Sequence, residues 1–307
     1  LHSPNEVARL QAACEKAGAV LAPVADNPVD AVWRNRPSMP VSPVVPHELR
    51  FAGVASEEKR KSIAADLQSR GIAAVVLTAP DSIAWLLNIR GGDLPRTPAP
   101  LAFAVLDDTG NARLFLDTRK LTAAARAHLG NAVSVAETAD FPAALDALGG
   151  RRVLADPASA SAFVFERLGA VKAEIVRDAD PCQLPNACKN AAEIAGTRAA
   201  HVRDGAARTG FLAWLDRAAS SGAVTELEAV EWLAQFRRGG ENFRDFSFDT
   251  ISGAGPNGAI VHYRATEASN RKLEPGSLYL VDSGAQYLDG TTDVTRTVFV
   301  PGGAPPT

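Results

Sequence analysis

Two carboxylates and a histidine in the C-terminal third of the chain are of residue types that catalyse hydrolysis. Asp282 follows the apolar run Leu278–Val281, and Asp293 lies eleven positions further on. Two carboxylates that face each other across antiparallel strands repel and lose solvation, unless a cation or a shared proton compensates. Carboxylate oxygens bind hard or borderline divalent ions such as manganese, and two bidentate carboxylates bridge a pair of metal ions. The two aspartates are therefore a candidate metal centre.

The same spacing supports a structural interpretation at least as well, in which Asp282 opens a turn and Asp293 caps the end of a strand. The register of the hairpin, which decides the residue that faces Asp282, is also open. If the loop centres on Tyr287-Leu288, the two carboxylates face each other. A tight turn at Asp289-Gly290, the strongest local turn signal, instead pairs Asp282 with Thr297. Facing carboxylates therefore require a wider loop or a β-bulge.

The histidine is His262, which follows the apolar run Ala259–Val261. A lone histidine in such a place is commonly a half-buried side chain whose nitrogens are satisfied by hydrogen bonds. Beside a metal-bound hydroxide, the same side chain relays a proton or holds a substrate carbonyl. Surface or packing roles are expected for the other four histidines, which are His2, His47, His128 and His201.

The glycine-rich run Gly253–Gly258 matches the G-x-G-x-x-G string of dinucleotide-binding proteins. That motif needs a helix N-terminus directed at the pyrophosphate. Here the run leads into Ala259–Tyr263, whose β-branched and aromatic residues favour a strand. We therefore expect a tight hairpin turn at Gly253–Gly258 and no nucleotide site.

Two helices and several strands are expected to position these residues. Small residues at three- and four-residue steps predict one long, closely packed helix over Ala191–Ala219. A capping box formed by Thr225 and Glu228 predicts the start of a second helix, which stops at Gly239-Gly240. Four strands are expected, at Phe246–Ile251, Ala259–Tyr263, Ser277–Asp282 and Asp293–Val300.

The preceding part of the chain predicts an α/β architecture. Helices and short apolar strands alternate between residues 56 and 177, which suits a compact three-layer domain. Prolines at three-residue intervals over residues 37–46 exclude a helix and indicate an extended linker before that domain. The expected division is the end of a first α/β domain in residues 1–36, an α/β domain in 37–182, and the start of a catalytic domain in 183–307.

Composition excludes several classes of protein. The 307 residues carry 32 Lys+Arg and 35 Asp+Glu, a net charge of −3, and no basic run, so neither nucleic acid nor a membrane surface is an expected partner. No apolar run approaches the ~20 residues of a membrane span. Cys14, Cys182 and Cys188 lack a Cys-x-x-Cys spacing, which argues against a disulfide framework and a thiolate zinc site and favours a reducing compartment.

Six segments carry a resemblance to a known family, namely Asn27–Trp33, Thr78–Gly91, Phe236–Arg238, Ser247–Ser252, Gly255–Tyr263 and Val281–Thr297. Together they resemble the aminopeptidase P (Xaa-Pro aminopeptidase) family of pita-bread metallohydrolases. The resemblance spans nearly the whole chain. It implies a creatinase-N-like α/β domain followed by the first half of an α+β pita-bread catalytic domain.

The resemblance implies a cytoplasmic, homodimeric hydrolase with two divalent metal ions, usually manganese, that removes an N-terminal residue preceding proline. Asp282 and Asp293 match the first two metal ligands of that family, and His262 matches the histidine near the metal-bound water and the substrate. Trp85 and Arg90 are candidates for the border of the active site, although a buried tryptophan and a surface ion pair are the simpler explanations.

The resemblance also implies ligands that this sequence lacks. The family completes its site with one histidine and two glutamates downstream of the second aspartate, whereas this sequence ends at Thr307. It begins at Leu1, and its single methionine is Met39. We therefore expect an internal portion of a longer protein, inactive by itself. Two alternatives stay open: a metal-free relative that serves as a binding or scaffold module, and a creatinase-like hydrolase.

Overall fold

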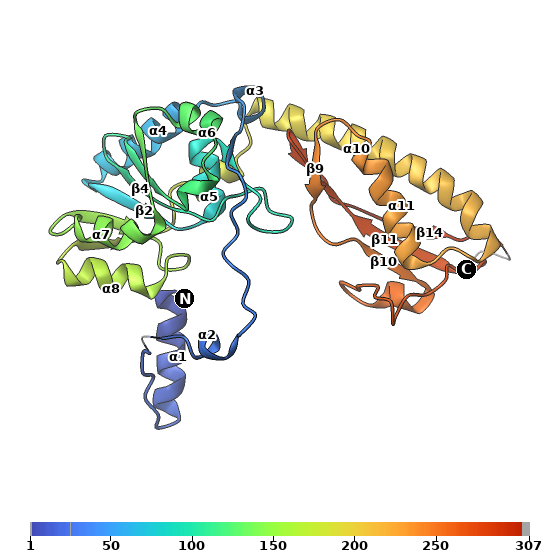
Figure 1. The fold of residues 1–307 in the computed structure, drawn as a ribbon, viewed down its shortest axis with the longest axis horizontal. Coiled ribbons are helices and arrows are strands. Elements are labelled where there is room, and N and C mark those ends of the chain that lie inside the picture. Colours follow the sequence, from blue (N-terminus) through green and yellow to red (C-terminus); the bar gives the residue numbers. More distant parts are fainter. Residues whose placement is uncertain (1, 25, 303–307) are drawn as a thin grey trace. The chain divides into compact units, whose positions relative to one another are not determined.

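The computed structural model describes residues 2–24 and 26–302, which form two compact units (Figure 1). The first unit contains the residues up to Leu49 together with Val54–Lys189, and the second contains Arg50–Gly53 together with the chain from Asn190 onwards. Each unit has its own hydrophobic core. The domain boundaries expected at residues 36 and 182 stay predictions.

A six-stranded mixed sheet forms the centre of the first unit. Its strand order is β6-β5-β4-β2-β7-β8, in which β4 is antiparallel to both neighbours and the other adjacent pairs are parallel. The strands are β2 (Ala74–Leu77), β4 (Phe103–Asp107), β5 (Ala112–Phe115), β6 (Val133–Ala136), β7 (Arg152–Ala155) and β8 (Glu174–Arg177). A separate two-stranded ladder pairs β1 (Val45–Pro46) with β3 (Ile89–Arg90).

The first unit also contains helices, which lie before, between and after the strands of this sheet in the chain. They are α1 (Pro4–Lys16), α2 (Pro28–Val32), α4 (Ser56–Ser69), α5 (Pro80–Leu87), α6 (Ala123–Leu129), α7 (Phe141–Asp146), α8 (Ala162–Ala170) and α9 (Gln183–Ala187), with 3-10 turns η1 (Thr118–Lys120) and η2 (Thr138–Asp140). The short α3 (Leu49–Ala52) lies where the two units meet along the chain. In the described part of the chain, no helix is both long and apolar enough to cross a membrane.

The strand β2 shows how the sheet separates two cores. Its residues are buried throughout and alternate between the faces. Val75 and Leu77 join the hydrophobic cluster that contains α4 and α5 side chains, whereas Ala74 and Val76 join the cluster that contains α7 and α8 side chains. Figure 1 shows these two helix pairs on opposite faces of the sheet. The expected three-layer α/β domain is therefore confirmed.

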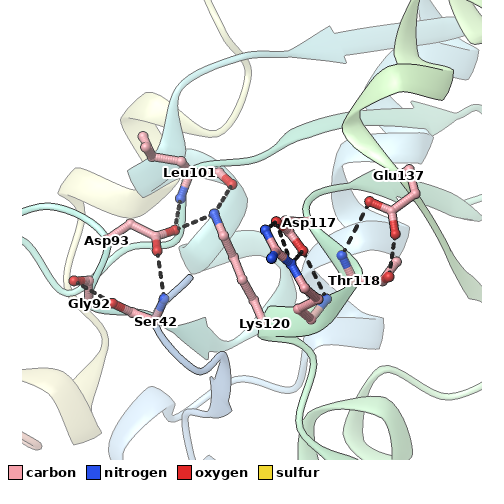
Figure 2. Close-up of polar contacts among 9 residues, drawn as sticks. Ser42, Gly92, Asp93, Leu101, Asp117, Thr118, Lys120 and Glu137 are labelled. Carbon is pink, nitrogen blue, oxygen red and sulfur yellow. Dashed lines mark hydrogen bonds and ion pairs between the residues drawn. The ribbon is translucent and has the colours of Figure 1, made fainter. Parts of the chain in front are cut away.

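The first unit contains a buried ion pair between Lys120 and Asp93 (Figure 2). Lys120 Nζ lies 2.8 Å from Asp93 Oδ2, and both side chains are almost inaccessible to solvent. Asp93 also accepts hydrogen bonds from the backbone N of Leu101 at 2.8 Å and of Ser42 at 3.2 Å. Because Ser42 belongs to the proline-rich segment, the ion pair holds that segment against the domain.

The second unit contains two long helices and two three-stranded antiparallel sheets, of order β10-β11-β14 and β13-β12-β9. Its helices are α10 (Ala191–Ala218) and α11 (Glu226–Arg238), with 3-10 turns η3 (Ala219–Ser221) and η4 (Gly255–Ala259). Its strands are β9 (Phe243–Phe246), β10 (Ile251–Ala254), β11 (Leu278–Ser283), β12 (Ala285–Tyr287), β13 (Gly290–Thr291) and β14 (Val294–Phe299).

The helices of this unit pack against β11. Phe211 and Leu215 of α10 and Leu233 of α11 are buried in one cluster with Tyr279 and Val281 of β11. The capping box at Thr225 is present, and its hydroxyl accepts from the backbone N three residues on. Both predicted helices are confirmed, as are the predicted strands at residues 277–282 and 293–300.

The strand predicted at Ala259–Tyr263 is wrong. The chain there forms η4 and then a turn, because it folds back onto β10. A Cβ on Gly253 would lie 2.8 Å from Cα of Gly258, so this close return of the chain requires glycine at both positions. The glycine-rich run is therefore a 3-10 turn packed on a strand and not a hairpin turn.

The strand predicted at Phe246–Ile251 is also wrong, since β9 ends at Phe246 and β10 begins at Ile251. The two strands belong to different sheets, and the chain crosses between them over residues 247–250. Ser247 fixes the start of this crossing, because its backbone N donates to the Gly284 carbonyl at 3.1 Å and its hydroxyl donates to the Thr292 carbonyl at 2.9 Å.

Candidate active site

The hairpin that carries both aspartates has a register between the two predicted ones. Asp282 pairs with Thr295, and the two-residue turn consists of Leu288 and Asp289, because Tyr287 pairs with Gly290. Both predicted registers, Asp282 opposite Asp293 and Asp282 opposite Thr297, are therefore wrong.

Packing against α10 explains why the turn is displaced by one residue from Asp289-Gly290. A Cβ on Gly290 would lie 2.9 Å from Cα of Thr197, so Gly290 is needed where β13 crosses the helix and not in the turn. The Asp289 carbonyl lies so close to Gly196 that no side chain fits there. Arg203 of α10 also forms an ion pair with the Asp289 carboxylate. Tertiary contacts override the local turn preference here.

The observed register nevertheless brings the two carboxyl groups together. Asp293 lies two positions before Thr295, so it is the diagonal neighbour of Asp282 on the same face of the sheet. Loss of solvation, the charge of Asp282 and a hydrogen bond with its carboxyl group raise the pKa of Asp293. Oδ1 of Asp282 is buried and has no hydrogen-bond partner among the residues that the structure describes.

Two buried arginines hold the backbone on either side of Asp282. Arg208 Nη2 of α10 donates to the Val281 carbonyl at 3.2 Å, and Arg237 Nη2 of α11 donates to the Ser283 carbonyl at 3.3 Å. The charge of Asp282 also acts on Arg208, whose pKa is lowered mainly by burial and by the charge of Arg237. The position of Asp282 thus depends on both long helices.

An acid on α10 fixes Arg237. Asp204 is fully buried and binds Arg237 through both carboxylate oxygens, at 2.8 and 2.9 Å. Tyr287 donates its hydroxyl proton to Oδ1 of Asp204 at 2.9 Å, and burial together with this acid raises the pKa of Tyr287. A bidentate Arg–carboxylate pair is geometrically specific, so it fixes the orientation of the guanidinium group.

The two aspartates fit a divalent metal in donor type but not in donor number. Their oxygens are hard ligands, and a buried carboxylate oxygen without a hydrogen bond suits a cation. However, the described residues contain no group of three or more histidine, cysteine or acidic side chains placed to hold a metal ion. A divalent ion takes roughly four to six ligands. By themselves, Asp282 and Asp293 would therefore supply only part of a coordination sphere.

His262 does not join a ligand cluster with the two aspartates in the described structure. It is exposed, and it lies in the turn after η4 with a φ of 54°, in the left-handed region that non-glycine residues seldom adopt. The next residue, Tyr263, is buried. The turn therefore presents His262 to solvent while its neighbour anchors the backbone.

Trp85 and Arg90 lie in the first unit. Trp85 is half-buried against that core, and Lys59 Nζ lies 4.5 Å from the centre of its ring. Arg90 is half-buried and donates to the Ile89 carbonyl at 3.0 Å. These contacts explain both residues structurally, and their place at the border of an active site stays a prediction.

Sequence reasoning missed the buried acids Asp204 and Glu226. The helical periodicity of the sequence could have identified both acids as buried. Asp204 lies on the same stripe of α10 as Phe211 and Leu215, and Glu226 lies on the same stripe of α11 as Leu233. An acid on a largely apolar stripe indicates a buried carboxylate that must have donors.

Two family models match the chain, one after the other. Residues 35–193 match the Creatinase/Prolidase N-terminal domain, and residues 195–307 match Metallopeptidase family M24. An X-prolyl aminopeptidase from Caenorhabditis elegans, described as a cytosolic enzyme with a di-nuclear active site, superimposes with a TM-score of 0.89 at 30% identity, over 99% of this chain and 51% of that one. The Xaa-Pro dipeptidase from Bacillus anthracis shares the fold, with a TM-score of 0.64 at 19% identity, over 81% of this chain and 66% of that one.

Curated relatives support the same family. The probable Xaa-Pro aminopeptidase P of Coccidioides posadasii (strain C735) is 40% identical over 95% of this chain and 46% of its own length. That of Aspergillus oryzae (strain ATCC 42149 / RIB 40) is 39% identical over 92% of this chain and 45% of its own length. The chain spans about half the length of these relatives. It belongs to the M24 metallopeptidase family as a homologue of Xaa-Pro aminopeptidase P, with a creatinase N-terminal domain ahead of a partial pita-bread domain.

Proposed function

We propose that the protein containing this chain is a metal-dependent aminopeptidase that hydrolyses the bond between an N-terminal residue and a following proline. The observation that carries the proposal is the contact of Asp282 and Asp293 on one face of the hairpin, with a buried carboxylate oxygen that lacks a partner among the described residues. The names of the relatives supply the substrate class.

In this proposal Asp282 and Asp293 hold two divalent ions, which we expect to be manganese. When bound, such ions activate water and stabilise developing negative charge. Arg208 and Arg237 keep Asp282 in place through the adjacent carbonyls. His262 hydrogen-bonds the substrate carbonyl from its exposed turn.

The 307 residues alone are expected to be inactive. Two carboxylates cannot complete the coordination of two ions, and the resemblance assigns the remaining ligands, one histidine and two glutamates, to a downstream part of the protein. A homodimeric state and a cytoplasmic location belong to the same proposal, which the family resemblance supports.

The test is an assay of the full-length protein supplied with Mn²⁺. We expect release of arginine from an Arg-Pro-Pro peptide, and no turnover of matched peptides without proline at the second position or of creatine. Turnover of creatine would instead favour a creatinase-like hydrolase. A full-length protein that purifies without stoichiometric metal, and that gains no activity when metal is added, would identify a metal-free binding module.

A further inference from the structure

A buried carboxylate at the start of α11 binds the loop that carries His262. The side chain of Glu226 is completely inaccessible to solvent. Its Oε1 accepts from the backbone N of Ala254 at 2.7 Å and from Asn257 Nδ2 at 2.9 Å. Its Oε2 accepts from the Tyr263 hydroxyl and from the backbone N of Arg271, both at 3.0 Å. Four donors therefore converge on one carboxylate.

These donors are spread along the whole loop between β10 and β11. Ala254 ends β10, Asn257 lies within η4, Tyr263 lies in the middle of the loop, and Arg271 lies near its end. The loop contains no strand among the described residues, and its own backbone hydrogen bonds are local ones such as Tyr263 N to the Ile260 carbonyl at 3.2 Å. Backbone hydrogen bonds hold the end of the loop, where Leu273 N donates to the Val224 carbonyl at 2.8 Å. The contacts of the Glu226 side chain hold the rest of the loop, from Ala254 to Tyr263.

The anchored residues alternate with exposed ones. Ile260 is 53% exposed and Val261 is 82% exposed, whereas Tyr263 is only 8% exposed. His262 lies between Val261 and Tyr263 with a positive φ. Such a backbone conformation is strained in a non-glycine residue and persists only when the surroundings determine it. The hydroxyl contact of Tyr263, one residue away, provides that constraint.

The site of Glu226 suits a charged carboxylate. Glu226 is the first residue of α11, where the helix dipole and the free backbone N–H groups favour negative charge. Four hydrogen bonds offset the cost of burying the charge. Tyr263 is well suited to remain a donor, because burial, and then the charge of Glu226, raise its pKa.

We infer that Glu226 is a positioning residue that holds the His262 turn, through Tyr263 and Asn257, in the conformation that the substrate meets. This inference rests on the proposed function of His262. Because Glu226 itself is completely buried, it acts through Tyr263 and Asn257.

The first test compares Glu226→Gln with Glu228→Gln in the full-length protein. Both residues lie in the first turn of α11, but Glu228 is exposed and only completes the capping box. The amide group that Glu226→Gln introduces would face backbone donors, so we expect hydrogen exchange over residues 255–271 to rise about tenfold. We expect Glu228→Gln to leave that exchange unchanged. Equal exchange in the two variants would overturn the inference.

The second test is a double-mutant cycle with His262→Ala on an Arg-Pro-Pro peptide. If Glu226 acts through His262, Glu226→Gln lowers kcat by about 100-fold in the native background and by less than about threefold when His262 is already absent. If Glu226→Gln lowers kcat by the same factor with and without His262, the two residues act independently and the inference is overturned. Should Glu226→Gln fail to fold, Tyr263→Phe removes only the hydroxyl group, with its contacts to Glu226, Asn257 and Ser269, and enters the same cycle. A wild-type protein without Xaa-Pro hydrolysis would contradict the proposed function, and the exchange comparison would then decide the anchoring role.

Discussion

Asp93 in the first unit and Asp282 in the second are both buried or half-buried acids near cationic side chains, but their surroundings differ. Asp93 accepts from Lys120 and from two backbone N–H groups, so both of its carboxylate oxygens are satisfied (Figure 2). Around Asp282, several buried polar atoms lack a partner within the described ranges: Asp282 Oδ1, Ser283 Oγ, Arg208 Nε and Nη1, and Arg237 Nη1.

This difference separates structural polar networks from functional ones. A buried network with complete hydrogen bonding needs nothing else and contributes to a unique fold. Buried polar groups without partners are costly, and they persist where a ligand or a further part of the protein supplies the contacts. The environment of Asp282 is of the second kind, which supports the proposed metal centre.

The largest expected effect comes from replacing Asp282, around which buried polar atoms lack partners among the described residues. We expect Asp282→Asn in the full-length protein to lower kcat on an Arg-Pro-Pro peptide by about 10³-fold, since a neutral amide cannot replace a carboxylate ligand. The control is Asp93→Asn, for which we expect kcat to stay within about threefold of the native value. Asp93 belongs to the network whose hydrogen bonds are complete. Initial rates at saturating Mn²⁺ measure both. Similar losses of kcat in the two variants would contradict the functional distinction between Asp282 and Asp93.

Breaking the ion pair behind Asp282 should affect stability strongly. Asp204→Ala leaves Arg237 buried without its acid, which costs about 3–5 kcal/mol, whereas the double replacement Asp204→Leu with Arg237→Met restores most of that free energy. Urea unfolding monitored by fluorescence of Trp214 and Trp232, whose rings stack 4.9 Å apart in this unit, measures the change. An Asp204→Ala variant as stable as the native protein would show that the pair is not a determinant of this core.

Metal binding should stabilise one unit selectively. At Mn²⁺ concentrations about 100 times Kd, the full-length protein gains about 2.7 kcal/mol in the region that holds the ion. We expect hydrogen exchange to slow for the β11 and β14 amides and to stay unchanged for β2. Equal slowing in both units would argue against a site at the aspartates.

The smallest effect concerns the first unit at acid pH. Burial, with smaller contributions from nearby cations, lowers the pKa of His47 from 6.5 to about 3. Between these values the unfolded chain binds a proton that the folded chain does not, so stability falls as the pH falls below about 6.5. The loss at pH 5 is about 2 kcal/mol. We expect His47→Gln to weaken the dependence of the unfolding free energy on pH, measured by urea unfolding. An unchanged pH dependence in this variant would contradict the assignment to His47.

Much of the fold follows from local sequence patterns. The helices α10 and α11 were predictable because periodic small and apolar residues and a capping box mark them. The strands were predictable because β11 begins with a short apolar run and β14 is rich in β-branched residues. The spacing of Asp282 and Asp293 left two registers open, and the observed register, in which they are diagonal neighbours, is neither of them.

What could not be predicted depends on contacts between distant residues. The hairpin register is set by Gly290 against Thr197 of α10, which no local turn rule contains. The segment after Gly258 has a strand-like composition but folds as a turn, because Glu226 binds Asn257 and Tyr263. In both places the deciding partner lies far away in the sequence.

Native mass spectrometry of the full-length protein tests the central claim most directly, because it counts bound ions without relying on activity. For protein loaded with Mn²⁺ we expect two ions per chain, and we expect loss of bound metal in Asp282→Asn but not in Asp93→Asn. A native protein that binds no Mn²⁺, or an Asp282→Asn variant that keeps both ions, would contradict the assignment of Asp282 and Asp293 as metal ligands.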